Sequence, residues 1–227
     1  MRIFSIDVGI KNLSYAFIDI ESTENYNIIE WNNINILHSF DDLQYVANEH
    51  AKWPKPMLID CIVHLNLEKD PHGPKSHLKS IIKLHLDKKC IKKKTGYDLE
   101  KIVENIKKHF NSTFKPIDCD LVLIENQPCM KNPQMKSMQM IIFTYFCLKN
   151  KNVKFVSASQ KMKFCSKKGW VNLENIKGDY KKTKQCSIDI VSKYILEKEH
   201  NIWTNSKKKD DLADVILQAF AYCDKCV

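Results

Sequence analysis

Acidic residues at three separate places in the chain could together bind a divalent cation. Asp7 lies inside an apolar segment, where an unpaired carboxylate loses hydration without compensation. Glu125 directly follows the apolar run at residues 121–124. Asp211 and Asp214 are spaced i, i+3 in a segment with helical apolar periodicity, so both project from the same side of the expected helix.

Two carboxylates one helical turn apart repel each other unless a cation joins them. Hard cations such as Mg²⁺ are held by a few carboxylates together with water and phosphate oxygens. Two such ions, about 3.5–4 Å apart, can clamp the attacking and leaving oxygens of a phosphodiester. Asp7, Glu125, Asp211 and Asp214 could supply ligands for both ions. Asp210 and Asp211 also have a simpler explanation, since anions are favoured at a helix N-terminus. That explanation does not extend to Asp214, which lies a turn further in.

The charge of the chain indicates a polyanionic partner. The 227 residues contain 36 Lys+Arg and 27 Asp+Glu, a formal net charge of +9. Two blocks, residues 75–115 and 149–184, carry the positive excess, and clustered charge of this kind suits nucleic acid. Arg2 is the only arginine, so contacts to the phosphate backbone should dominate over base reading. A solvated lysine surface, or an A/T-rich genome, would also explain the lysines.

The periodicity of apolar residues predicts an α/β fold. We expect strands at 2–8, 12–20, 25–37, 120–125 and 152–156, and helices at 97–110, 133–149, 180–197 and 208–223. A lysine-rich loop is expected from about 157 to 178. Three short-linked strands followed by alternating helix and strand indicate a mixed five-stranded sheet with helices on both faces. In such sheets ligands gather beyond the carboxyl ends of the parallel strands, where Glu125 is expected.

We expect a single domain over residues 1–227 with a peripheral insertion at about 41–95. That stretch contains four prolines and a lysine run, with some helix around 77–90. Cys61, His64, His77, His85 and Cys90 could ligate a structural zinc there, although their spacing matches no tight zinc pattern. Nine scattered cysteines, with no secretory signal and no long apolar run, indicate an intracellular protein with reduced thiols.

Three short motifs resemble those of the ribonuclease H-like Holliday junction resolvases, in particular the poxvirus and RuvC-type enzymes. They are IDVGIKN at 6–12, LIENQP at 123–128 and KDDLAD at 209–214. The resemblance implies a ribonuclease H-like fold in which Asp7, Glu125, Asp211 and Asp214 are catalytic and bind two Mg²⁺ or Mn²⁺ ions. Asp210 is the alternate ligand if the register is shifted by one. A viral source is our expectation.

The same resemblance implies paired, symmetric incision of a branched, four-way DNA junction by a homodimer. Two symmetric cuts need two active sites on a two-fold dimer, and the helix at 133–149 could supply the interface. A lysine that assists the reaction is expected among Lys181, Lys182 and Lys184. The expected nucleic-acid-binding residues are these three with Lys167, Lys168 and Tyr180. Tyr180, Trp170 and Phe164 could stack on unpaired bases, although ordinary packing is expected for at least one of them.

Other functions remain open at this point. Another nuclease of the same fold, acting on RNA–DNA hybrids or on flap DNA, would need the same acidic residues. A non-catalytic DNA-binding protein would keep the lysines without needing the acidic set. An actin-like ATPase shares the Asp7-x-Gly9 start, but it needs a second glycine-rich loop, and the chain has only five glycines.

Overall fold

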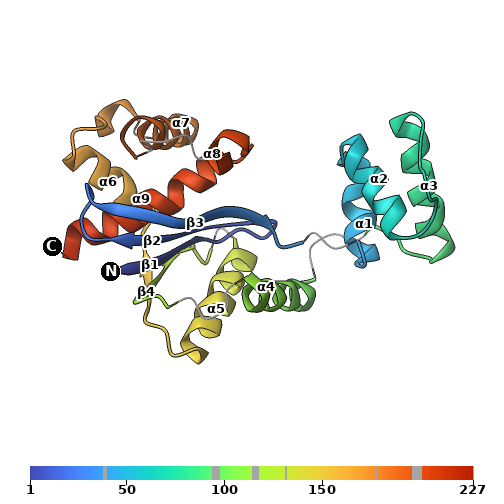
Figure 1. Cartoon of the computed structure of the whole chain (residues 1–227), viewed down its shortest axis with the longest axis horizontal. Helices are drawn as coiled ribbons and strands as arrows, with labels where there is room; N and C mark the ends of the chain where they lie inside the picture. Colours follow the sequence, from blue (N-terminus) through green and yellow to red (C-terminus); the bar gives the residue numbers. More distant parts are fainter. Residues whose placement is uncertain are drawn as a thin grey trace. The chain divides into compact units, whose positions relative to one another are not determined.

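The computed structural model describes residues 1–37, 40–93, 98–113, 118–130, 132–176, 178–195 and 201–226. The chain divides into two compact units. The sheet unit comprises Met1–Ile36 and Ile106–Val227, and the helical unit comprises Leu37–Asn105. Figure 1 shows the elements of both units.

The sheet unit is built on five strands in the order β3-β2-β1-β4-β5. They are β1 (Arg2–Asp7), β2 (Asn12–Ile20), β3 (Tyr26–Asn35), β4 (Leu121–Glu125) and β5 (Val153–Val156). The first three form an antiparallel meander, whereas β4 is parallel to both β1 and β5. The expected mixed five-stranded sheet is therefore confirmed.

The register of the sheet explains why two of the acidic residues meet. Ile6 of β1 is paired with Ile124 of β4. The next residue in each strand is the acidic one, and each is the last residue of its strand. Because β1 and β4 are parallel neighbours, Asp7 and Glu125 emerge side by side at the carboxyl edge of the sheet.

Helices cover both faces of the sheet (Figure 1). One face carries α9 (Lys209–Cys226), which contacts β1 to β4. The helices α6 (Ser159–Lys167) and α7 (Tyr180–Ile190) pack against α9. On the other face, α5 (Pro133–Leu148) packs on β4 and β5. There Phe146 of α5 meets Phe4 of β1, at 5.6 Å between ring centroids, and Phe110 of α4 (Leu99–Thr113) at 5.3 Å.

Buried hydrogen bonds fix α9 on the sheet. Gln218 is buried, and its Nε2 donates to Ser5 Oγ at 3.1 Å, to the Ile6 carbonyl at 3.3 Å and to the Leu123 carbonyl at 3.4 Å. Trp31 Nε1 of β3 donates to the Leu212 carbonyl at 3.0 Å. Because the buried amide of Gln218 bonds to both β1 and β4, it fixes the position of α9 along the two strands that carry Asp7 and Glu125.

The helical unit contains α1 (Leu43–Glu49), η1 (His50–Lys52), α2 (Lys55–His64) and α3 (Lys75–Lys88). Its core includes Leu58, Cys61 and Ile62 of α2 and Leu78, Ile82 and Leu86 of α3, all buried. The helix expected around 77–90 is present as α3, and two of the four prolines in this stretch mark helix starts. Pro54 and Pro74 are the N-cap residues of α2 and α3, positions that need no backbone N–H donor within the helix.

Two expectations about the C-terminal third were wrong. The lysine-rich loop expected from about 157 to 178 contains α6, because Lys161, Phe164 and Cys165 recur at helical spacing and are buried. The helix expected at 180–197 is α-helical only to Ile190 and continues as a π-helix, η3 (Val191–Ile195). Residues 196–200 lie outside the described residues, and α8 (Asn201–Asn205) precedes α9. None of the described helices is long and apolar enough to cross a membrane.

Candidate active site

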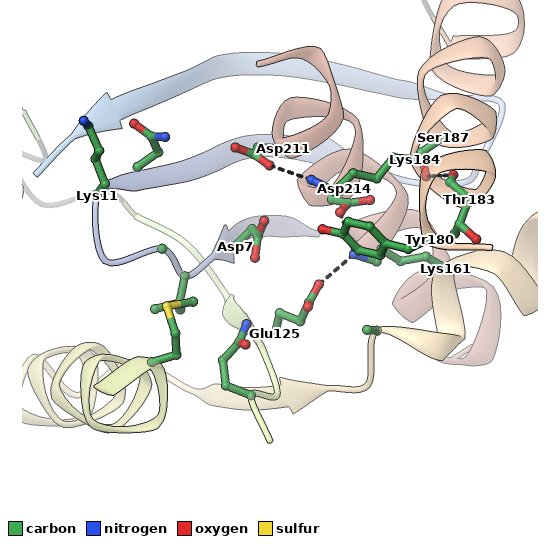
Figure 2. A pocket seen from close by; sticks show the side chains of 16 residues that line it. Asp7, Lys11, Glu125, Lys161, Tyr180, Thr183, Lys184, Ser187, Asp211 and Asp214 are labelled. Carbon is green, nitrogen blue, oxygen red and sulfur yellow. Dashed lines mark hydrogen bonds and ion pairs between the residues drawn. The ribbon is translucent and has the colours of Figure 1, made fainter. Parts of the chain in front are cut away.

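Four acidic side chains from three elements line a cavity of about 500 Å³ at the carboxyl edge of the sheet (Figure 2). Asp7 ends β1, Glu125 ends β4, and Asp211 and Asp214 lie one turn apart on α9. The structure thus brings together the four residues that the sequence singled out. Asp210 does not line this cavity.

Burial and mutual repulsion both act on these carboxylates. Burial raises the pKa of Asp7 well above its ordinary value, and the neighbouring Glu125 carboxylate raises it further. Burial likewise raises the pKa of Asp214, although Lys161 acts in the opposite direction. Such clustered acids keep their charge only if positive charge is close at hand.

Lys161 of α6 supplies part of this positive charge, and the sequence analysis did not identify it. Its ammonium lies 2.6 Å from Glu125 Oε2 and 3.2 Å from Asp214 Oδ2, and its side chain is 7% exposed. Burial alone would lower the pKa of Lys161, but the carboxylates of Asp214, Glu125 and Asp7 together raise it. Lys161 is therefore charged, and it bridges the acids of β4 and α9.

The only sequence signal for Lys161 was its helical spacing from Phe164 and Cys165. A lysine at helical spacing from buried residues lies on the buried side of the helix, so its side chain extends along the interior. Because this segment contains many lysines, the spacing of Lys161 is informative only once the segment is recognised as a helix.

Lys184 of α7 neutralises the start of α9. Its ammonium donates a hydrogen bond to Asp210 and lies 3.4 Å from Asp211 Oδ1. Burial would lower the pKa of Lys184, but the hydrogen bond to Asp210, the one with Tyr180 and the charge of Asp211 together raise it above its usual value. Burial alone would raise the pKa of Asp210, but the same hydrogen bond together with the charges of Lys184 and Lys208 lowers it. Asp210 is thus paired with Lys184, and Asp211 is left to line the cavity.

Tyr180 stands at the mouth of this cavity, at the first position of α7. Its side chain is 72% exposed, and the Lys184 ammonium lies 5.3 Å from the centre of its ring. Lys181 and Lys182, which follow it, are exposed and do not line the cavity. The exposed ring is therefore accessible to a ligand that approaches the acidic residues.

Two turns shape the rim beside Asp7 and Glu125. At Gly9, an added Cβ would lie 1.9 Å from the Asn12 carbonyl oxygen, so the turn after β1 needs glycine. After β4, the backbone N–H of Gln127 donates to Oε1 of the buried Gln139 at 3.0 Å. Lys136 Nζ donates to the same Oε1 at 3.0 Å, and this network holds the turn to α5.

The other predicted DNA-contacting residues lie away from the cavity. Lys167 pairs with Asp224 at 2.7 Å, and Lys168 pairs with Glu24 at 3.1 Å. Phe164 is buried and packs edge-on against Trp170. Trp170 in turn stacks on Tyr194, with ring centroids 5.0 Å apart. Among the three aromatic candidates, Tyr180 is exposed, Trp170 is partly buried and Phe164 is buried. The expectation that at least one of them serves ordinary packing is confirmed by Phe164.

The donor set of the cavity fits a hard divalent cation in its chemistry. All four acidic groups offer carboxylate oxygens, the ligands that Mg²⁺ and Mn²⁺ prefer. In the part of the chain that the structure describes, no three acidic, histidine or cysteine side chains are already gathered as a coordination group. Lys161, which lies between Glu125 and Asp214, explains this, because it keeps these carboxylates paired with an ammonium.

The zinc site considered for the helical unit is not assembled among the described residues. Cys61 is buried in the core of that unit, and burial raises the pKa of its thiol to about 12, which disfavours the thiolate that zinc needs. His64 is directed to Asp41, at 2.8 Å.

Comparison with known proteins agrees with this architecture. The family described as "Mitochondrial resolvase Ydc2 / RNA splicing MRS1" matches residues 3–129, more than half of the chain. The matched segment contains Asp7 and Glu125 but ends before Lys161 and α9, so the grouping of these residues rests on the geometry above.

Two viral proteins of unknown function are similar in sequence. Uncharacterized protein 97L of Invertebrate iridescent virus 3 is 29% identical over 222 residues, covering 97% of this chain and 98% of that protein. Uncharacterized protein L451 of Acanthamoeba polyphaga mimivirus is 30% identical over 150 residues, covering 56% of this chain. The matched region spans only 34% of the mimivirus protein.

A solved structure shares the fold. The Fowlpox virus resolvase, solved as a complex with substrate Holliday junction DNA, superposes with a TM-score of 0.54 at 16% identity. The superposition covers 100% of this chain and 99% of that protein. At this identity the likeness shows a common ribonuclease H-like fold.

Proposed function

Because the chain belongs to the family of the mitochondrial resolvase Ydc2 and the RNA-splicing protein MRS1, we propose that it resolves four-way DNA junctions. In this proposal it is a metal-dependent endonuclease that hydrolyses two symmetrically placed phosphodiester bonds. The observation that carries the proposal is the convergence of Asp7, Glu125, Asp211 and Asp214 on one cavity. A basic chain with four acids at one point needs both a cation and a polyanion there.

Asp7, Glu125, Asp211 and Asp214 would hold the metal, and we propose two Mg²⁺ or Mn²⁺ ions per site. Bound there, divalent ions supply positive charge to a phosphodiester and activate a water molecule for attack. Lys161 and Lys184 would neutralise the remaining carboxylate charge, because Lys161 already contacts Glu125 and Asp214, and Lys184 contacts Asp211. Tyr180 would stack on a base beside the cavity, while Lys181 and Lys182 would contact the backbone.

The family name also includes RNA splicing, which needs no cleavage by the protein itself. The acidic set favours hydrolysis, because a protein that only binds nucleic acid gains nothing from four carboxylates facing a phosphate. Another nuclease of this fold, acting on RNA–DNA hybrids or flap DNA, would use the same residues.

Glu125→Gln is expected to abolish cutting of a four-way junction and to leave binding intact. Loss of an outer-shell partner of a metal costs about 10–100-fold, so loss of a direct ligand should lower the rate by more than about 100-fold. The measurement is cleavage of a panel of four-way, flap, RNA–DNA hybrid and linear duplex substrates with Mg²⁺ or Mn²⁺. Binding of each substrate is measured separately without metal.

Glu174→Gln is the matched control, because Glu174 is exposed and does not line the cavity. Junction cutting by Glu125→Gln at the wild-type rate would remove Glu125 from the mechanism. Cutting of the hybrid in preference to the junction would favour the other nuclease activity.

We also propose that the active form is a homodimer that pairs through α5. Two cuts related by a two-fold axis need two active sites with the same symmetry. The outer side of α5 presents Met140, Thr144, Cys147 and Leu148 to solvent, and Leu148 is 78% exposed. An exposed apolar helix face is typical of an interface between copies.

Met140→Glu combined with Leu148→Glu is expected to convert the dimer into a monomer that nicks junctions without pairing the two cuts. Sedimentation measures the mass, and a junction in a supercoiled plasmid separates single nicks from paired cuts. Ile29→Glu is the control, since Ile29 is a similarly exposed apolar residue on β3, and it should stay dimeric. Paired cutting by a wild-type protein that sediments as a monomer would disprove the dimer.

Both similar proteins are viral. On this basis we propose that the chain is encoded by a virus and acts in the cytoplasm of the host cell.

A further inference from the structure

The α3 helix of the helical unit carries a row of lysines that the cavity does not use. The lysine row consists of Lys75, Lys79 and Lys83, spaced four residues apart. Residues with this spacing lie on one side of a helix, and the rise of 1.5 Å per residue separates successive members by about 6 Å along the axis. Lys75 and Lys83 are exposed, and Lys79 is partly exposed.

The stability of the helix does not explain this row of lysines. Leu78, Ile82 and Leu86 already provide the buried contacts of α3. Lysines spaced i, i+4 repel one another, and Lys75 and Lys79 also lie near the positive end of the helix dipole. The first turn holds no acidic residue, and the N-cap makes no side-chain hydrogen bond. Charge at the N-terminal end of this face, at Lys75 and Lys79, therefore opposes folding of the helix, whereas Lys83 has Asp87 four residues further along.

The row is also unpaired among the residues that the structure describes, where no acidic side chain makes an ion pair with it. Other lysines of the same unit do have such partners. Lys52 lies 3.6 Å from Glu49, and Lys101 lies 2.9 Å from Asp42. The difference indicates that the anionic partner of the row comes from outside the chain.

More exposed lysines lie at the end of α3 and directly after it. Lys88, Lys89, Lys92 and Lys93 are all exposed. The segment after α3 is held in place, since Gln44 Nε2 of α1 donates to the Lys92 carbonyl at 2.9 Å. A line of separate ammonium groups with no arginine matches a regularly charged backbone better than the edges of bases.

We propose that the helical unit is a peripheral insertion into the nuclease domain and carries a second nucleic-acid surface. In it the lysine row binds the phosphate backbone of a DNA duplex. Within the proposed function, on which the identity of the substrate rests, this duplex is an arm of the four-way junction. The surface would add affinity without sequence preference, because phosphate contacts carry no base information.

The test measures binding of the full chain to linear duplex DNA and to four-way junctions across salt concentrations, without metal. The variant is Lys75→Gln/Lys79→Gln/Lys83→Gln. Each phosphate contact contributes about 0.9 to the slope of log affinity against log salt, so loss of three contacts should reduce the slope by about 2.7. The matched control is Lys52→Gln/Lys55→Gln/Lys69→Gln, which removes three lysines of the same unit outside the row. The slope of log affinity against log salt for this control should change by less than about 0.9, the contribution of one phosphate contact.

An unchanged slope in the row variant would overturn the proposal, and so would an equal loss in the control. Equal loss would mean that net charge matters and position does not. Because binding to plain duplex is read without cutting, a protein that cuts no junction would end the proposed function and leave this test intact.

A second variant separates binding from folding. In Lys75→Glu/Lys79→Glu, the new acidic side chains lie near the helix N-terminus, and the one at position 79 is spaced i, i+4 from Lys83. Both effects should keep or raise the thermal midpoint. Duplex affinity should nevertheless fall at least as far as in the Gln variant. Normal duplex binding by this variant would overturn the proposal even if the Gln variant is destabilised.

Discussion

Asp7→Asn is expected to raise the thermal stability of the metal-free protein while it abolishes junction cutting. Asp7 lines the cavity beside Glu125 and near both acids of α9, and burial followed by repulsion from Glu125 raises its pKa. A carboxylate in such surroundings destabilises the folded state when it is charged, and an amide of the same shape removes that charge. Functional residues commonly lower stability in this way.

The measurement is the midpoint of thermal unfolding in EDTA, together with junction cleavage in Mg²⁺. For a chain of this size each kcal/mol of relief should raise the midpoint by about 2–4 °C. Asp60→Asn is the control, because Asp60 is an exposed residue of the helical unit. It should change neither quantity.

The Asp7→Asn variant also tests whether metal binds at this site. A ligand that binds only the folded state at 100 times its Kd adds about 2.7 kcal/mol of stability. Mg²⁺ or Mn²⁺ should therefore raise the midpoint of the wild-type protein and have little effect on Asp7→Asn. Equal stabilisation of both proteins by metal would place the ion elsewhere, and a lower midpoint for Asp7→Asn in EDTA would refute the repulsion argument.

Lys161→Met is expected to have the opposite effect on stability. The ammonium of Lys161 contacts Glu125 and Asp214 inside the protein, and its removal leaves these carboxylates without their nearest positive charge. Breaking a buried ion pair by removing one partner costs about 3–5 kcal/mol. The low end applies here, because the carboxylates line a cavity, so the midpoint should fall by about 6–12 °C.

Divalent metal should restore more stability to Lys161→Met than to the wild type, since it supplies the missing charge to the same acids. The double variant Lys161→Met/Glu125→Gln should recover part of the lost stability, because it removes charge as well as its partner. Thermal unfolding with and without Mg²⁺ measures both effects. A lysine that served only as packing would show neither the metal rescue nor the recovery in the double variant.

The lysine of α6 also illustrates the limit of sequence patterns. Apolar runs identified β1 and β4, and the acid at the end of the second run was readable from the chain alone. Asp7 was expected inside the first strand, whereas β1 ends at Asp7. The stripe of α9 likewise placed Asp211 and Asp214 on one side of a helix, and residues 212, 215, 216, 219, 220 and 223 of that stripe are indeed buried. These are local patterns, each set by the geometry of a single strand or helix.

The sequence by itself determined the five strands, the helices α5 and α9, and the acids that β1, β4 and α9 carry, because backbone periodicity assigns each side chain to a face. The tertiary structure decided which charges meet. It placed Lys161 between Glu125 and Asp214, paired Lys184 with Asp210, and added α1 and α2 to the expected helix α3 in the helical unit. Such pairings depend on how α6, α7 and α9 pack against the sheet, and the energy of a charge is set by its neighbours in space, which no periodicity along the chain encodes.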